Sequence, residues 1–161
     1  MTETRRAILV PLDGSELAER ALEMARRLAV ATEATILLLY VVPEHADEFQ
    51  NGFAPEIAEA QRYLSEVAGR VRANTTTGES APVVLTQVCV GKPADRIISE
   101  AELWHINHIV MATHGRGGLN RVIHGSVADS VLRRSSVPVL LVPPQAVGVA
   151  QTPLFFGRAA L

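Results

Sequence analysis

The stretch AILVPLDGS, residues 7–15, sets the pattern that the rest of this chain repeats. Its apolar run, Ala7 to Leu12, predicts a buried strand, and the turn sequence DGS ends that strand with a helix N-cap at Ser15. Apolar side chains then recur at helical spacing from Leu17 to Leu28, and Thr35 to Val42 is apolar throughout. The chain therefore begins with a strand, an amphipathic helix and a second strand.

The rest of the chain continues this alternation. The pattern predicts a loop from Glu44 to Ala54, a helix opened by Pro55, a strand from Pro82 to Val90, a helix from Ala94 to Trp104, a strand from His108 to Ala112, a short helix near Ser126 and a strand from Val137 to Val142. Five strands alternating with helices imply right-handed crossovers and a doubly wound, mainly parallel α/β sheet with about four helices. Ligands of such sheets bind beyond the carboxyl ends of the strands, so the loops after the first and fourth strands are the expected site.

Composition narrows the classes of function. The 161 residues suit one domain, and 48% hydrophobic with only 4% aromatic residues indicate an aliphatic core. A net charge of −2 argues against binding DNA or RNA, and no segment reaches the roughly 18 apolar residues of a membrane span. We therefore expect a cytoplasmic protein without nucleic-acid or membrane partners. Cys89 is the one cysteine and falls in an apolar stretch, which predicts a small buried side chain.

A glycine-rich segment follows the fourth predicted strand, from Ala112 to Ser126. Its glycines let the backbone approach a ligand and turn successive N–H groups toward an anion. Ser126 and Asp129 have the spacing of a capping box, so a helix N-terminus that favours phosphate is expected there. The segment also gathers local positive charge, from His114, Arg116, Arg121 and His124. These features predict phosphate binding, with a flexible loop that holds no ligand as the alternative.

The end of the first strand carries the other predicted half of the site. Asp13 is placed to accept hydrogen bonds from ribose hydroxyls, or simply to support the turn into the helix. Pro11, Leu12 and Val41 offer an apolar wall for a base. Neither a Walker motif nor a G-x-G-x-x-G turn is present, and the histidines show no metal-ligand spacing. The sequence thus predicts nucleotide binding with no catalytic residue and no metal site.

Read in order, three motifs resemble those of the universal stress protein family, in its small single-domain, ATP-binding form. They are ILVPLDGS at residues 8–15, GKPA at residues 91–94, and ATHGRGG at residues 112–118 with Gly125-Ser126 and VPVLLV at residues 137–142. The family's glycine motif is G-x2-G-x9-G-[ST]. Gly115, Gly125 and Ser126 fit it, whereas Ala112 replaces the first glycine.

The resemblance implies a Rossmann-like sheet of order 3-2-1-4-5 that binds ATP, or AMP or ADP, together with Mg²⁺. Adenine and ribose contacts are implied from Pro11, Leu12, Asp13 and Val41. Phosphate contacts are implied from Gly115, Arg116, Gly125, Ser126 and Val127, with Ala112, His114 and Gly118 also in the expected site. The affinity for ATP is then expected to depend on what the methyl group of Ala112 does.

The resemblance also implies a homodimer and no general catalytic role. In the implied strand order Val137 to Val142 is an edge strand, apolar on both faces, which its own copy can cover across a two-fold axis. We expect a domain over residues 1–143 and a flexible C-terminal tail over residues 144–161. A nucleotide-regulated homodimer is the leading hypothesis. A stress-response scaffold that has lost nucleotide binding and a weak ATPase are the alternatives.

Overall fold

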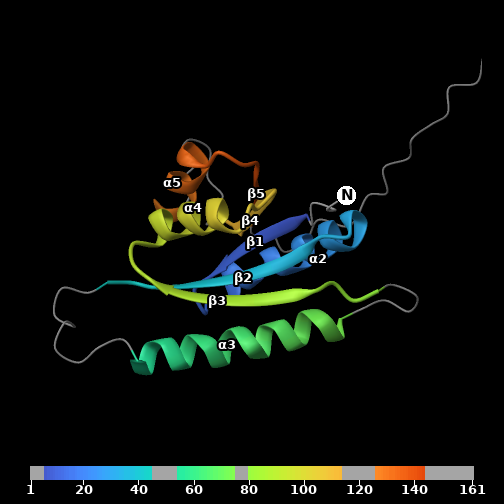
Figure 1. Cartoon of the computed structure of the whole chain (residues 1–161), viewed down its shortest axis with the longest axis horizontal. Coiled ribbons are helices and arrows are strands. Elements are labelled where there is room, and N and C mark those ends of the chain that lie inside the picture. Colours follow the sequence, from blue (N-terminus) through green and yellow to red (C-terminus); the bar gives the residue numbers. More distant parts are fainter. Residues whose placement is uncertain (1–5, 45–53, 75–79, 114–125, 144–161) are drawn as a thin grey trace, which may run out of the picture.

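The computed structural model describes residues 6–44, 54–74, 80–113 and 126–143. Within them the strands are β1 Ala7–Leu12, β2 Thr35–Val42, β3 Val84–Val90, β4 His108–Ala112 and β5 Val139–Val142. All pairings are parallel, and the strand order is β3-β2-β1-β4-β5 (Figure 1). The expected doubly wound α/β sheet of order 3-2-1-4-5 is confirmed.

The bounds of β1, β2 and β4 match the prediction, whereas β3 and β5 each begin two residues later. Pro82 and Pro138 stand at or next to the expected starts, and a proline has no N–H to give to a strand ladder. The carbonyl of Pro138 still accepts the N–H of Ile109 at 2.9 Å. The chain thus runs alongside β4 before regular pairing begins.

The helices are α1 Glu16–Glu19, α2 Ala21–Thr32, α3 Ala54–Ala73, α4 Pro93–Leu103 and α5 Ser126–Arg134. Ser15 is the predicted N-cap, and its Oγ accepts the N–H of Ala18 at 3.1 Å. The prediction of a single helix after β1 is wrong, because the helix breaks at Arg20 into α1 and α2. The N–H of Arg20 bonds to the carbonyl of Leu17, three residues back, at 3.2 Å, and this tighter turn ends α1.

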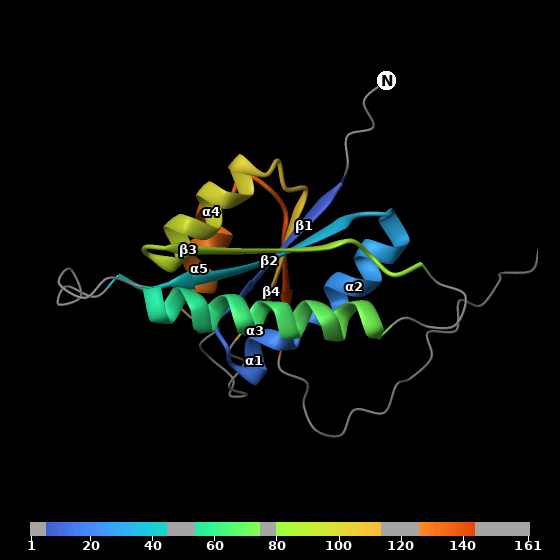
Figure 2. The ribbon, with the colours of Figure 1, turned by 60° about the horizontal axis from the view of Figure 1, so that its bottom comes forward.

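The helices cover the two faces of the sheet. Figure 1 shows α4 and α5 on one side and α3 on the other, and Figure 2 brings α3 forward with α2 beside it. Successive side chains of a strand point to opposite faces. Val10 and Leu38 accordingly pack in the cluster under α2 and α3, whereas Leu9 and Leu37 pack in the cluster under α4 and α5. Even-numbered strand residues therefore belong to the α2/α3 face and odd-numbered ones to the α4/α5 face.

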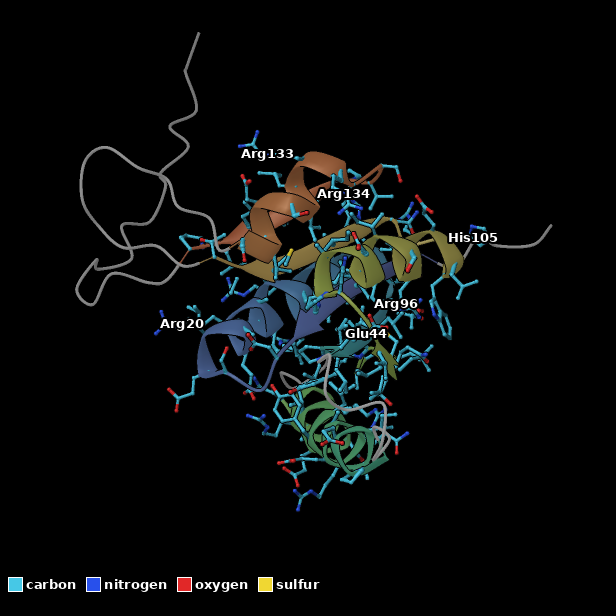
Figure 3. All side chains as sticks on the ribbon, turned by 90° about the vertical axis from the view of Figure 1, so that its left-hand side faces the viewer. Arg20, Glu44, Arg96, His105, Arg133 and Arg134 are labelled. Atoms are coloured by element: carbon cyan, nitrogen blue, oxygen red, sulfur yellow. The ribbon has the colours of Figure 1, made fainter. Side chains whose placement is uncertain are left out.

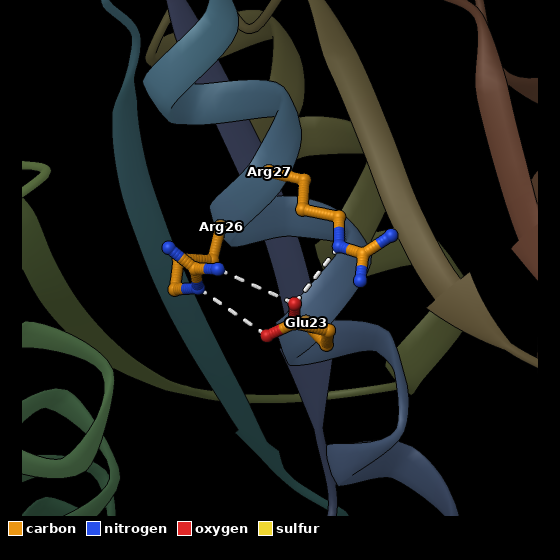
Figure 4. Close-up of polar contacts among 3 residues, drawn as sticks. All are labelled: Glu23, Arg26 and Arg27. Atoms are coloured by element: carbon orange, nitrogen blue, oxygen red, sulfur yellow. Dashed lines mark hydrogen bonds and ion pairs between the residues drawn. The ribbon is translucent and has the colours of Figure 1, made fainter. Parts of the chain in front are cut away.

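Two carboxylates on the α2/α3 side make different kinds of ion pair. Glu23 pairs within α2, with Arg26 at 3.2 Å and Arg27 at 2.9 Å (Figure 4). Glu19 reaches across to α3, where Arg70 lies at 2.9 Å and the hydroxyl of Tyr63 donates to it at 3.0 Å. The hydrogen bond from Arg70 lowers the pKa of Glu19. This contact ties the short helix α1 to the long helix α3.

Candidate functional site

The pairing of β1 with β4 stops before the strands end. The structure describes both strands in full, and Leu9↔Ile109 is the last pair toward their carboxyl ends. Odd-numbered residues of β1 turn their backbone groups toward β4, as the carbonyl of Ala7 does when it accepts the N–H of Asn107 at 2.9 Å. The next bond of this ladder would need an N–H at Pro11, which proline lacks. The sheet thus opens where its strand order reverses, the place where doubly wound sheets bind ligands.

The α4/α5 face brings together three of the predicted contact residues. Val41 of β2 and Val127 of α5 are both half-buried against the cluster on that face. Pro11 shares the face by strand alternation and is half-buried as well. Leu12 is different, because its side chain is only 4% exposed and packs in the opposite cluster. The apolar wall predicted from Pro11, Leu12 and Val41 is therefore split, and Leu12 offers only its backbone to the Val41 side.

Asp13 supports the turn that follows β1. Its Oδ1 accepts hydrogen bonds from the N–H of Ser15 at 3.0 Å and from the Ser15 hydroxyl at 2.6 Å. Its Oδ2 accepts none from the described residues, and the side chain is exposed. The two roles weighed for Asp13 are thus compatible, since one oxygen holds the turn and the other is available to a ribose hydroxyl.

The phosphate half of the predicted site is described only at its two ends. Helix α5 begins at Ser126, whose side chain is exposed, so the free N–H groups of a helix N-terminus lie there. At the other end of the segment, Ala112 is the last residue of β4. The predicted contacts between them lie outside the described residues: His114, Gly115, Arg116, Gly118 and Gly125.

Ala112 carries the departure from the family's glycine motif, and its methyl group lies on the α2/α3 face. It is even-numbered, and it pairs with Val142, which packs in the cluster under α2 and α3. Val41 and Val127 belong to the opposite cluster. The extra methyl group therefore points to the face opposite these two valines.

A polar cluster that the sequence did not predict lies along α4. Arg96 donates to Glu100 at 2.7 Å, and Trp104 donates to the other oxygen of Glu100 at 3.1 Å. Figure 3 looks onto the end of the sheet where β2 leads to Glu44, and Arg96 lies on this side of α4. The only local signal was the i, i+4 spacing of the three residues. Cys89 lies next to Arg96, and burial raises the pKa of its thiol, so the prediction of a buried cysteine is confirmed.

The described residues around the end of β1 include groups that can bind a ligand. No group of three or more His, Cys, Asp or Glu among them is arranged to hold a metal ion. Nor is any helix in this part of the chain long and apolar enough to cross a membrane. The arrangement provides an apolar wall, a free carboxylate oxygen and a helix N-terminus around the end of β1.

Residues 4–143 match the family model described as Universal stress protein family. The chain belongs to the universal stress protein family. A curated member, MJ0531 of Methanocaldococcus jannaschii, is 31% identical to it, and the match covers 84% of this chain and 80% of the relative. The resemblance stated on the motifs is therefore confirmed.

Solved structures of universal stress proteins share the fold. That of MJ0577, also from Methanocaldococcus jannaschii, superposes with a TM-score of 0.71 at 28% identity and covers 89% of this chain and 99% of that one. The universal stress protein of Archaeoglobus fulgidus in complex with dAMP gives a TM-score of 0.65 over 88% of this chain and 98% of that one. At 21% identity this second likeness shows the fold alone.

Proposed function

We propose that this universal stress protein binds an adenine nucleotide, ATP in the first place and ADP or AMP as alternatives, with Mg²⁺ accompanying ATP. The observation that carries the proposal is the convergence of Pro11, Val41 and Val127 on one face of the sheet, where the β1–β4 ladder ends. The dAMP complex of the Archaeoglobus fulgidus protein supports it by showing an adenine nucleotide on the same fold.

In this proposal the base lies against Val41 and Pro11, and a ribose hydroxyl donates to the free Oδ2 of Asp13. The phosphates lie at the start of α5, where the N–H groups following Ser126 and the helix dipole favour negative charge. Gly115, Arg116, Gly118, Gly125 and His114 are proposed to complete the phosphate contacts. Ala112 does not oppose this, because its methyl group lies on the other face of the sheet.

We propose binding without catalysis, or with very slow hydrolysis, in a cytoplasmic, stress-responsive protein. In this proposal Asp13 lies at the ribose rather than at the phosphates, and one of its oxygens is already engaged by Ser15. A group that holds a turn is poorly free to move as a general base. The proposed role is therefore to report nucleotide occupancy to partners.

A homodimer through β5 is part of the proposal. The residues of β5 are aliphatic and half-buried, and the strand lies at the edge of the sheet. The carbonyls of Pro138 and Val142 face β4, where they accept from Ile109 and Thr113. The backbone groups of Val139 and Leu141 therefore point outward, which provides the unpaired edge that a second copy would cover.

Thermal melting of the full chain with millimolar ATP, ADP or AMP, with and without Mg²⁺, tests the nucleotide proposal. A nucleotide at 100 times its Kd is expected to add about 2.7 kcal/mol to the free energy of unfolding. The absence of any shift with all three nucleotides would contradict the proposal and favour a scaffold that has lost binding. Phosphate release measured in the same samples is expected to be absent or very slow.

A matched pair of variants locates the phosphates. Ser126→Asp adds a carboxylate at the start of α5, where it suits the helix dipole but repels a phosphate, so affinity is expected to fall by about tenfold or more. Ser136→Asp adds the same charge at an exposed position beyond the other end of α5 and is expected to change affinity by less than about twofold. Equal losses in the two variants would place the phosphates elsewhere.

Light scattering tests the dimer. Val139→Pro removes an outward-facing N–H of β5 and leaves the bonds to β4 in place, a position where an edge strand tolerates proline. The wild-type chain is expected to be a dimer and the variant a monomer that still melts cooperatively. A wild-type chain that is monomeric at tens of micromolar would end the dimer proposal.

A further inference from the structure

The α2/α3 face of the same sheet end has a hollow of its own. It measures about 340 Å³ and lies between the end of β2 and the first turns of α3, lined among others by Tyr40, Val42, Glu56, Glu59 and Tyr63. Tyr40 and Val42 are even-numbered residues of β2, so they point away from Val41 and from the proposed nucleotide. The hollow therefore lies on the opposite face of the sheet from Val41, although Gly14, the residue after Asp13, also lines it.

Two tyrosine rings form one wall of the hollow. Tyr40 and Tyr63 meet edge to face, with ring centroids 5.9 Å apart and planes at 75°. A hydrogen bond fixes each hydroxyl. That of Tyr40 donates to the carbonyl of Asp13 at 3.5 Å, and that of Tyr63 donates to Glu19 at 3.0 Å. Burial raises the pKa of both phenols, so both rings are neutral at physiological pH. The wall is fixed, aromatic and uncharged.

Two carboxylates also line the hollow, and both come from α3, the helix that carries Tyr63. Glu56 and Glu59 are exposed and make no hydrogen bond or ion pair with any residue that the structure describes. The negative charge of Glu59 and Asp13 contributes to the raised pKa of Tyr40, after burial. The nearest cation that acts on the tyrosines, Arg70, is already paired with Glu19. Among the described residues that line the hollow, two are thus carboxylates and none is a cation.

We propose that this hollow binds a small organic ammonium ligand, of the linear polyamine class, with its charged nitrogen between Glu56 and Glu59 and its methylene chain against the rings of Tyr40 and Tyr63. Carboxylates attract an ammonium group, and aromatic faces attract it further through their quadrupole while they bury its carbon chain. An anionic ligand is repelled here, and a purely apolar one leaves the carboxylates unused. The site is distinct from the proposed base contacts, which lie on the other face, and the two sites come nearest at Asp13 and Gly14.

Calorimetric titration of spermidine into the full chain tests the inference. Saturable binding to the wild type is expected, with affinity about tenfold weaker in Glu59→Gln, which removes the charge and keeps the shape. Glu66→Gln is the control, because Glu66 lies two helical turns further along α3, is exposed like Glu59 and does not line the hollow. It is expected to change affinity by less than about twofold. Melting curves of both variants verify that each is folded.

Three results would overturn the proposal. The first is no heat of binding at millimolar spermidine, and the second is equal weakening in Glu59→Gln and Glu66→Gln. The third is that MgCl₂ displaces spermidine as strongly as a linear diamine does at equal ionic strength. Ser126→Asp separates the two sites. It is expected to weaken ATP and leave spermidine unchanged, while Glu59→Gln does the reverse, so failure of nucleotide binding would leave the spermidine result valid.

Discussion

The two faces of the sheet differ at the carboxyl end, although the same strands build both. On the α4/α5 face, Pro11, Val41 and Val127 make an apolar surface next to a helix N-terminus that favours anions. On the α2/α3 face, Tyr40 and Tyr63 line a hollow together with two carboxylates. One face thus suits a phosphate-bearing ligand and the other a cation.

This difference comes from single steps along a strand. Tyr40 and Val41 are neighbours in β2 and point to opposite faces, as do Pro11 and Leu12 in β1. A sheet covered by helices on both sides can therefore carry two sites of opposite charge preference within one short segment. Variants that change one face and leave the other intact test this difference between the two faces.

The largest effect is expected from Gly91→Ala, which disturbs the contact between β3 and α4. Gly91 has a φ of +148°, and a Cβ there would lie 2.8 Å from Cγ and 2.9 Å from Cδ of Arg96. The strained backbone and the displaced Arg96, which holds the buried Glu100, are expected to lower the free energy of unfolding by about 2 kcal/mol in urea denaturation.

Gly69→Ala is the control for that substitution. Gly69 lies inside α3 with open space where a Cβ would stand, so alanine is expected to raise the free energy of unfolding by about 1 kcal/mol. A loss in both variants would mean that the strain at Gly91 is not the cause. Binding of spermidine is expected to survive Gly91→Ala, since the hollow is on the other face.

A smaller effect is expected from Arg70→Gln on the α2/α3 side, about 0.5–1 kcal/mol at pH 7. Hydrogen bonds from Arg70 lower the pKa of Glu19 below 4.5, so the stabilisation is complete above pH 4.5 and is lost as the pH falls through the lowered value. Urea denaturation of both proteins from pH 7 to pH 3 should therefore show the difference shrinking below pH 4.5.

Arg27→Gln is the matched control, because it removes an ion pair made within one helix (Figure 4). Glu23 keeps its contact with Arg26 in that variant, so the loss is expected to be about 0.3 kcal/mol or less. If Arg27→Gln lowered the free energy of unfolding as much as Arg70→Gln, the ion pair between α1 and α3 would contribute no more than one within a helix.

The smallest effect on binding is expected from Ala112→Gly, which restores the family's glycine. The methyl group of Ala112 lies on the face away from Val41 and Val127, so nucleotide affinity measured by calorimetry is expected to change by less than about twofold. The free energy of unfolding is expected to fall by about 0.5–1 kcal/mol, because glycine weakens a strand. A tenfold gain in affinity would show that the methyl group does reach the ligand.

The sequence predicts the frame of the molecule because local pattern determines it. The bounds of β1, β2 and β4 follow from uninterrupted apolar runs, and the motif resemblance supplied the strand order. The break at Arg20 was missed because the apolar spacing continues across α1 and α2, and only backbone bonding reveals it.

The faces of the site residues could be predicted only in part. The alternation of side chains along a strand predicts from sequence alone that Leu12 and Pro11 point to opposite faces of the sheet. Which face holds the ligand depends on where α5 packs. The contact between Gly91 and Arg96 and the meeting of Tyr40 with Tyr63 arise from tertiary packing, so no local pattern signals them. The predicted loop contacts from His114 to Gly125 lie outside the described residues and stay predictions.

Pro11 has a consequence for the energetics of ligand binding. A proline in a central strand is ordinarily a defect, since it removes a ladder bond. Here it keeps β1 and β4 from pairing at the one place where the proposed ligand needs the sheet open. No strand hydrogen bonds have to break when that ligand arrives, so the free energy of its contacts is not reduced by the cost of opening the protein. The missing N–H is thus a form of preorganisation built into the covalent structure of one residue.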